Sequence, residues 1–267
     1  MLENPRSARV RAVAKLTKRR VRDETGLFLL EGPQAVREAL SYRPDGIVQL
    51  FATPAAADKH TDLRRRAADA GIDVIITSEQ VLAVMADTVS PQGIVAVARQ
   101  FPTSARAVFA ASPRLIAVCE QVRDPGNLGT IIRAADAAGA DAVILTGRTV
   151  DPFNPKVVRS TTGSLFHVPI APGGDLADVV DAARAAGLHV VAADVKGDDL
   201  LAAREDGTLA RPTAWLFGNE ARGLDDDALA LADTALRLPI YGRAESLNLA
   251  TAASVCLYET AFAQRTA

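Results

Sequence analysis

Apolar runs and segments of helical periodicity alternate along the chain. In the first hundred residues, apolar runs at 28–32, 47–52, 72–77 and 93–98 predict strands, and amphipathic segments at 33–40, 57–71 and 78–86 predict helices. Pro33 suits a first helical turn, and Ser78 suits a helix cap. The basic segment at residues 5–20 predicts a further helix. Strands that alternate with helices predict an α/β domain.

A second series of the same kind begins at Leu115. Strands are predicted at 115–120, 142–147, 166–170, 188–194, 214–218 and 235–240, and helices at 128–138, 154–164, 175–187, 225–232 and 246–263. These strands are short, apolar and largely non-alternating, which is typical of a parallel sheet covered on both faces. Prolines and small polar residues at 101–114 indicate a linker, placed at 106–113 between a domain of residues 1–105 and a second α/β domain of residues 114–267.

Composition agrees with two folded domains. The chain has 267 residues, 49% hydrophobic and 23% charged, which suits globular domains and argues against wholesale disorder. No apolar run is long enough to span a bilayer, and no secretory signal is recognisable. Cys119 and Cys256 lie in apolar runs, which predicts buried free thiols and a reducing, cytoplasmic setting. The cysteines and the three histidines lack the spacing of zinc ligands, so no metal is expected.

Basic residues gather at the start of the chain. Residues 1–105 carry fifteen Lys and Arg against twelve Asp and Glu, whereas residues 106–267 carry fifteen against twenty. A basic arm on a mildly acidic body indicates a polyanionic partner, and a solvated amphipathic helix is the alternative. The arm, residues 1–25, holds three acidic residues and eight basic ones: Arg6, Arg9, Arg11, Lys15, Lys18, Arg19, Arg20 and Arg22.

Three polar segments, at 124–139, 215–224 and 238–255, each follow the end of a predicted strand, at Glu120, Phe217 and Ile240. In parallel sheets ligands bind outside the carboxyl ends of the strands, so the three segments predict one shared site. No segment has the glycine spacing of a dinucleotide-binding turn or a P-loop, which argues against a dinucleotide-dependent oxidoreductase. The polar candidates are Asn127, Arg133, Glu220, Ser246 and Asn248.

Each candidate also has a purely structural interpretation. Asn127 and Ser246 are residue types that cap helices, and both roles stay open. Arg133 also fits a helix surface, and Glu220 a solvated loop. Gly218, without a Cβ, would let the backbone approach a cofactor closely.

The segments NLGTIIRAADAAG, FGNEARGL and LPIYGRAESLNLATAASV resemble, in this order, the three motifs of the SpoU (TrmH) branch of the SPOUT RNA methyltransferases. FLLEGPQAVREAL and SPQGIVAVA resemble the L30e-like substrate-binding domain that precedes the catalytic domain in many members. The resemblance covers nearly the whole chain. It implies methylation of a ribose 2′-hydroxyl by S-adenosylmethionine, a C-terminal trefoil knot within a mostly parallel sheet, and a homodimer with the active site at its interface.

The resemblance also assigns roles. Arg133 would engage the ribose 2′-hydroxyl, as a base or by positioning alone, and Glu220 would hold Arg133 or contact the partner subunit. The catalytic set is Asn127, Arg133, Glu220, Ser246 and Asn248. The cofactor set is Phe217, Gly218, Asn219, Leu238, Ile240, Ser246, Leu247 and Asn248.

RNA recognition would fall to residues 1–105. The residues expected to contact RNA are Arg9, Arg11, Lys18, Arg19 and Arg20, together with Arg133. A second basic cluster, Arg64–Arg66, fits a solvated helix face equally well. Members with this N-terminal domain favour 23S-type large-subunit rRNA as substrate. A transfer RNA methyltransferase of the same family, or a non-catalytic RNA-binding factor that keeps the fold, are the alternatives.

Overall fold

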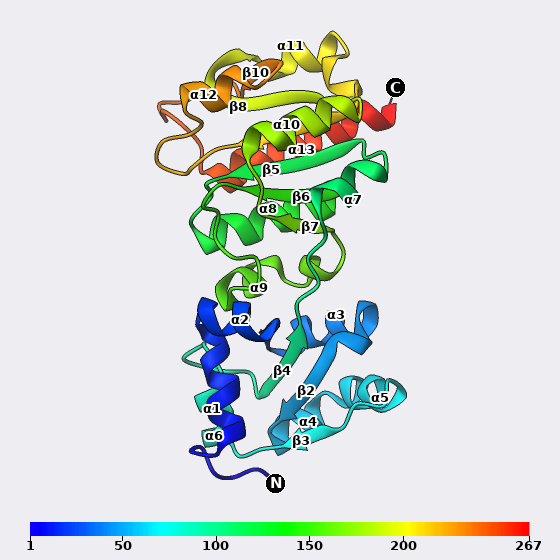
Figure 1. Cartoon of the computed structure of the whole chain (residues 1–267), viewed down its shortest axis with the longest axis vertical. Coiled ribbons are helices and arrows are strands. Elements are labelled where there is room, and N and C mark those ends of the chain that lie inside the picture. The colour runs from blue at the N-terminus through cyan, green and yellow to red at the C-terminus, as the bar shows by residue number, and fades with distance from the viewer. Residues whose placement is uncertain (267) are drawn as a thin grey trace. The chain divides into compact units, whose positions relative to one another are not determined.

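The computed structural model describes residues 1–266, and these form two compact units (Figure 1). The first unit contains residues 1–101 and 153–167, and the second contains residues 102–152 and the chain from Val168 onward. The segment 153–167 therefore belongs to the first unit, although elements of the second unit flank it in the sequence. The predicted boundaries, with one domain wholly before the other, did not anticipate this insertion.

The first unit is built on a four-stranded mixed sheet. The strand order is β1-β4-β2-β3, where β4 is antiparallel to both β1 and β2, and β3 is parallel to β2. The strands are β1 (Leu27–Glu31), β2 (Ile47–Ala52), β3 (Val74–Ile76) and β4 (Ile94–Arg99). Each overlaps a strand that the apolar runs predict, although β1 begins one residue before the predicted run and β4 ends one residue after it.

Helices cover this sheet. They are α1 (Ala8–Ala14), η1 (Lys15–Thr17), α2 (Arg19–Thr25), α3 (Pro33–Tyr42), η2 (Pro44–Gly46), α4 (Pro54–Lys59), α5 (Thr61–Asp69), α6 (Glu79–Met85), α9 (Pro155–Thr161) and η3 (Ser164–Phe166). Pro33 occupies the first turn of α3, and the Ser78 side chain caps α6, as predicted. The helix predicted at 57–71 is instead two helices, α4 and α5, that meet at His60.

The basic arm is not the single helix that residues 5–20 predict. It is α1, the 3-10 turn η1 and α2, with Lys18 in extended conformation between the last two. The buried Arg22 side chain explains how the break is stabilised, because its Nη1 donates to the carbonyls of Leu16 (2.8 Å) and Thr17 (2.9 Å). Those carbonyls would otherwise lack a partner at the end of the helix.

The second unit is built on a six-stranded sheet in the order β10-β8-β9-β5-β6-β7, and every neighbouring pair is parallel. The predicted parallel sheet is confirmed. Its strands are β5 (Leu115–Glu120), β6 (Ala142–Thr146), β7 (Ile170–Pro172), β8 (His189–Asp199), β9 (Thr213–Phe217) and β10 (Thr234–Arg237). The strand predicted at 166–170 is wrong, because Ser164–Phe166 forms a 3-10 turn and β7 begins only at Ile170.

Helices cover both faces of this sheet. Side chains of α7 (Ala105–Ala110), α10 (Leu176–Ala185) and α12 (Asp226–Ala230) join one apolar cluster with β5, β6, β8 and β9. On the opposite face, α13 (Leu249–Thr266) packs beside α8 (Pro125–Ala138), and the Trp215 indole donates to Thr260 Oγ1 (2.9 Å). The short helices α11 (Leu200–Glu205) and η4 (Thr208–Ala210) follow β8. Helix α7, capped by Ser104, occupies most of the predicted linker at 106–113.

Both cysteines are buried free thiols, as predicted, and burial raises the pKa of Cys119 and of Cys256 to about 12. No helix within residues 1–266 is long and apolar enough to cross a membrane. The trefoil knot that the resemblance implies stays a prediction.

Candidate active site

The three polar segments meet beside one cavity of the second unit. The cavity has a volume of about 310 Å³ and lies where β9 and β10 end, beside the middle of β8. The loop after β9 lines it with residues 219–223, and the chain after β10 lines it with Leu238, Ile240, Ser246 and Leu247. Cys256 of α13 and residues 193–195, in the middle of β8, also line it. Segments distant in sequence thus form one site, as the strand ends predict.

Glu220 joins the first two segments. Its carboxylate accepts hydrogen bonds from the backbone N–H groups of Arg123 (3.1 Å) and Asp124 (2.8 Å), and from the side-chain amides of Asn127 (3.4 Å) and Asn219 (3.2 Å). The Asn219 amide also donates to the Gln121 carbonyl (2.9 Å). Glu220 is therefore a structural link between the segments and not the free loop acid of the alternative interpretation.

Asn127 and Asn248 join the first segment to the third. Asn248 Nδ2 donates to Asn127 Oδ1 (3.0 Å), while Asn248 Oδ1 accepts from the backbone N–H groups of Ala250 (2.9 Å) and Thr251 (3.3 Å) at the start of α13. Glu220, Asn127 and Asn248 form one continuous hydrogen-bonded chain.

The predicted helix caps are corrected. Asp124, not Asn127, caps α8, because its Oδ1 accepts from the Asn127 backbone N–H (2.8 Å). Asn248, not Ser246, caps α13, which begins three residues later than the pattern predicts. Both errors have the same cause, since Asp, Asn and Ser cap helices about equally well and the pattern alone cannot choose between neighbours.

Arg133 stands apart from this network. It lies on α8 and is exposed, and its side chain makes no hydrogen bond or ion pair with any residue from 1 to 266. The carboxylate expected to hold it, Glu220, instead bonds the backbone of Arg123 and Asp124. Within one chain, the proposed Glu220–Arg133 contact is therefore not formed.

Six of the predicted cofactor residues line the cavity: Phe217, Asn219, Leu238, Ile240, Ser246 and Leu247. Gly218 and Asn248 do not. A Cβ on Gly218 would overlap the backbone of Gly223 and Leu224, so this glycine allows a tight turn and not a close approach of the cofactor. The turn is closed by two backbone hydrogen bonds between Asn219 and Gly223, of 3.0 and 2.8 Å.

Sequence reasoning missed the contribution of β8. Asp194 of β8 lines the cavity, as does Arg237 of β10, so the lining carries both signs of charge. Since β8 is parallel to β9, the argument that selected Glu120 and Phe217 applies equally to the strand predicted at 188–194. No motif follows the strand predicted at 188–194, so the sequence does not mark Asp194 as a site residue.

In the first unit, the cations of the basic arm differ in availability. Arg19 pairs with Asp23 (3.6 Å) and Arg20 with Glu24 (2.7 Å), each one helical turn apart. Within the described chain, the exposed side chains of Arg9, Arg11 and Lys18 have no ion-pair partner. The buried Arg22 is not available to a ligand.

The second basic cluster is partly engaged in structural contacts. Arg64 lies 3.8 Å from Asp58, and Arg66 Nη1 donates to Ser41 Oγ (3.0 Å). The described residues contain no group of three or more His, Cys, Asp or Glu side chains arranged to hold a metal ion.

Comparison with known proteins agrees with this geometry. Residues 114–258 match the SpoU rRNA Methylase family, and residues 7–96 match the MRM3-like substrate binding domain. The 23S rRNA (guanosine(2553)-2′-O)-methyltransferase RlmP of Bacillus subtilis is 35% identical over 257 residues, which cover 96% of this chain and 97% of that protein.

Two solved structures extend the likeness to the fold. An AdoMet-bound rRNA methyltransferase from Sinorhizobium meliloti superposes with a TM-score of 0.81 at 33% identity and covers 97% of this chain and 96% of its own. The SpoU methyltransferase AviRb from Streptomyces viridochromogenes, in complex with AdoMet, gives 0.82 at 30% identity, with 98% and 100% covered. The chain belongs to the SpoU rRNA methylase family of RNA 2′-O-methyltransferases, as its three motifs predict.

Proposed function

We propose that this protein methylates a ribose 2′-hydroxyl of 23S-type large-subunit rRNA with S-adenosylmethionine as methyl donor. The observation that carries the proposal is a cavity lined by the second and third family motifs, beside the Glu220–Asn127–Asn248 chain that joins all three motifs. Relatives named as 23S rRNA 2′-O-methyltransferases support the substrate class, and AdoMet-bound structures of similar fold support the cofactor.

The cavity suits S-adenosylmethionine in size and chemistry. Its apolar side chains, Phe217, Leu238, Ile240 and Leu247, offer a surface for the adenine ring. The charges of Asp194 and Arg237 at the lining have the signs needed by an amino acid's ammonium and carboxylate groups. When bound there, S-adenosylmethionine supplies an electrophilic methyl group for in-line transfer to oxygen.

Arg133 would bring the ribose to this donor. A guanidinium has five N–H donors and no acceptor, so Arg133 serves better as a donor to the target phosphate and ribose oxygen than as a general base. Its lack of any partner within residues 1–266 leaves its N–H groups available for RNA. The Glu220–Asn127–Asn248 chain fixes the loops around the donor, and Ser246 offers a hydroxyl at the cavity wall. Holding the reacting groups in line can supply several kcal/mol of the barrier.

We further propose that the second unit acts as a homodimer. Apolar side chains are exposed along α13, where the rings of Tyr258 and Phe262 pack at a tilt of 54°, and Val255 and Leu201 are exposed as well. An unpartnered apolar face of this kind suits an interface between copies. A partner subunit at this face would also complete the active site, as the family resemblance implies.

The two units would divide the work. Residues 1–105 hold and orient RNA, through the unpaired cations of the basic arm, and residues 114–267 transfer the methyl group. With ribosomal RNA as the proposed substrate, we also propose a cytoplasmic location.

The test is methyl transfer from labelled S-adenosylmethionine to separate pools of unmodified 23S-type rRNA and tRNA, followed by mapping of the 2′-O-methylated nucleotide. We expect transfer to the rRNA pool alone, at one position. Transfer only to tRNA would favour the second enzyme activity of this family. Normal cofactor binding without transfer to either pool would favour a non-catalytic RNA-binding factor.

A further inference from the structure

The first unit contains a second cavity, distant in sequence from the family motifs. It is a groove of about 440 Å³ between the basic arm and one face of the sheet. Exposed residues of α1 (Ala8, Arg11 and Ala12, with Lys15 of η1) form one wall, and Val48 and Gln49 of β2 with Val97 of β4 form the other. Its volume lies within the usual range for ligand sites, about 300–1,000 Å³.

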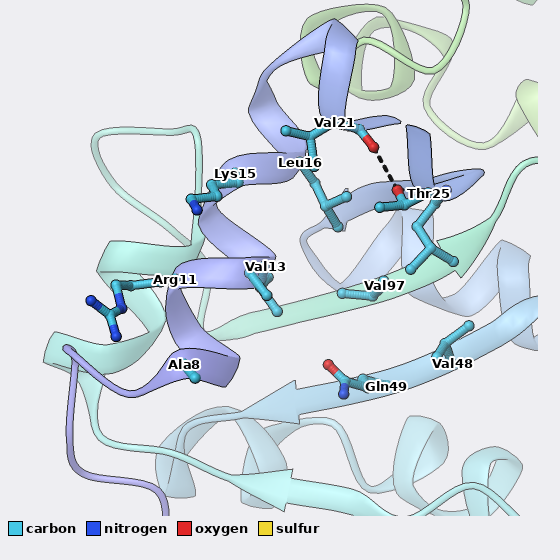
Figure 2. Close-up of a pocket in the computed structure, with 12 residues that line it drawn as sticks. Ala8, Arg11, Val13, Lys15, Leu16, Val21, Thr25, Val48, Gln49 and Val97 are labelled. Carbon is cyan, nitrogen blue, oxygen red and sulfur yellow. Dashed lines mark hydrogen bonds between the residues drawn. The ribbon is translucent and has the colours of Figure 1, made fainter. Parts of the chain in front are cut away.

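The walls of this groove are mainly apolar, although it opens to solvent. Figure 2 shows Val13, Leu16 and Val97 directed into the space between the arm and the strands. Val48 of β2 is 41% exposed, whereas Phe51 of β2 and Val95 and Val97 of β4 are buried in one cluster with side chains of α1 and α6. A β-bulge between Ile47 and Gln49 accompanies this opening. The apolar lining of the groove therefore combines the exposed Val48 with the buried Val13, Leu16 and Val97.

One polar group faces the groove without a partner. Gln49 carries the only side-chain amide in the lining, and no residue from 1 to 266 hydrogen-bonds to it. The other uncharged polar side chain of the lining, Thr25, already donates to the Val21 carbonyl (2.6 Å) and accepts from the Leu27 N–H (3.3 Å). The Gln49 amide therefore has a donor and an acceptor free for a planar polar ligand.

The rim of the groove is cationic. Arg11 and Lys15 lie one turn apart on the arm and contribute to the lining, and in Figure 2 their charged ends point away from Val48 and Gln49. Neither side chain forms an ion pair with a described residue, and Arg6, Arg9 and Lys18 extend the unpaired charge along the arm. The acids of the arm are Glu3, Asp23 and Glu24, and the last two are occupied by Arg19 and Arg20.

We infer that this groove is a slot for one unpaired nucleobase of the RNA, with the flanking phosphates held at its rim. Aliphatic walls pack against the faces of a base, the Gln49 amide meets a polar base edge, and Arg11 and Lys15 neutralise the phosphates on either side. The inference rests on the proposed function for its partner, RNA. It adds a recognition site in the first unit that does not involve the methyl-transfer cavity.

The test compares two valines of nearly equal exposure in the first unit. Val48 is 41% exposed in the groove, and Val84 of α6 is 44% exposed outside its lining. Binding of single-stranded decauridine to the full-length protein is measured for Val48→Glu and Val84→Glu. We expect a tenfold or greater rise in Kd for Val48→Glu and less than a threefold rise for Val84→Glu. Because the two variants add the same charge, equal effects would overturn the inference.

Two further measurements keep the test independent of folding defects. A decauridine with one 4-thiouridine is photocrosslinked to the unmodified protein, and we expect adducts on peptides that contain Gln49 or Lys15. Adducts confined to the second unit would overturn the inference. A duplex of ten base pairs presents no unpaired base, so its Kd should change equally in Val48→Glu and Val84→Glu.

The failure of this inference can be separated from failure of the proposed function. If the unmodified protein methylates rRNA while Val48→Glu leaves both Kd and KM for RNA unchanged, the slot alone is wrong. If decauridine binds the slot but no RNA is methylated, the proposed reaction alone is wrong. If Val48→Glu changes the oligomeric state and not RNA affinity, the groove binds a second copy of the chain and the inference is overturned.

Discussion

The loops of the second unit and the basic arm of the first present opposite kinds of polar surface. Around the methyl-transfer cavity, the polar groups already satisfy one another, as the four donors to the Glu220 carboxylate show. Along the arm, Arg9, Arg11 and Lys18 have no partner in the described chain.

This difference matches what each surface is proposed to bind. A pocket for a small cofactor benefits from preorganised walls, because little order must then be created on binding. A surface for a polyanion benefits from free cations, because each phosphate contact releases a counterion. Arg133 is the exception in the second unit, since it is exposed and unpaired like the cations of the arm. That exception agrees with its proposed contact to RNA.

The largest effect on stability is expected for a substitution at Gly218, in the tight turn that follows β9. Gly218→Ala places a Cβ into the backbone of Gly223 and Leu224, and we expect a loss of about 3 kcal/mol in the free energy of unfolding, together with loss of cofactor binding. Gly223→Ala is the matched control, because a Cβ there meets nothing and only its φ of +67° is strained, at a cost of about 1–2 kcal/mol. Urea unfolding and calorimetry measure both. A smaller effect for Gly218→Ala than for Gly223→Ala would contradict the packing argument.

Arg133→Ala tests the exception. We expect kcat to fall about 100-fold, which corresponds to about 2.7 kcal/mol of transition-state free energy, while the Kd for S-adenosylmethionine and the free energy of unfolding stay nearly constant. Both should stay constant because Arg133 is exposed and lies outside the cavity lining. Arg106→Ala, at another exposed arginine of the second unit, is the control. Full activity of Arg133→Ala in single-turnover assays would remove Arg133 from the mechanism.

The sequence predicts some regions of this fold more accurately than others, and the reasons are physical. The parallel sheet and the meeting of three segments follow from strand ends, which apolar runs mark clearly. The secondary structure of residues 154–170 is predicted less accurately. The helix predicted to reach residue 164 ends at Thr161, because Thr162 (φ +50°) and Gly163 (φ +109°) adopt left-handed conformations. The following apolar residues look like a strand but pack in the first unit, where Phe166 stacks on Phe101.

The sequence also does not predict which groups form hydrogen bonds with one another within the site. A motif shows that Glu220, Asn127 and Asn248 belong together, but not that Glu220 bonds backbone N–H groups in preference to Arg133. The residue that caps a helix is the one whose side chain reaches a free backbone N–H in the folded chain, and the sequence does not show this. In this protein, Asp124 accepts from the Asn127 N–H and Asn248 accepts from the Ala250 N–H.

A smaller effect tests the corrected cap. Asn248→Ala removes the acceptor for the first N–H groups of α13 and the donor to Asn127, so we expect a loss of about 1 kcal/mol in the free energy of unfolding. Ser246→Ala, two residues earlier, should cost less than about 0.5 kcal/mol, because Ser246 is exposed and does not cap the helix. Thermal and urea unfolding compare the two. An equal loss in both variants would restore Ser246 as a cap.

The smallest effect is expected for the removal of one cation from the basic arm. It is measured as a change in the salt dependence of RNA binding. Lys18→Ala removes one unpaired charge, so the slope of log K against log salt concentration for RNA binding should fall by about one. Lys59→Ala, an exposed lysine at the end of α4, is the control and should leave the slope nearly unchanged. Cofactor binding, which takes place in a preorganised cavity, should show little salt dependence in either variant. If Lys18→Ala and Lys59→Ala alter the RNA slope equally, the arm acts only through net charge, and the contrast between a committed RNA surface and an ordinary solvated helix disappears.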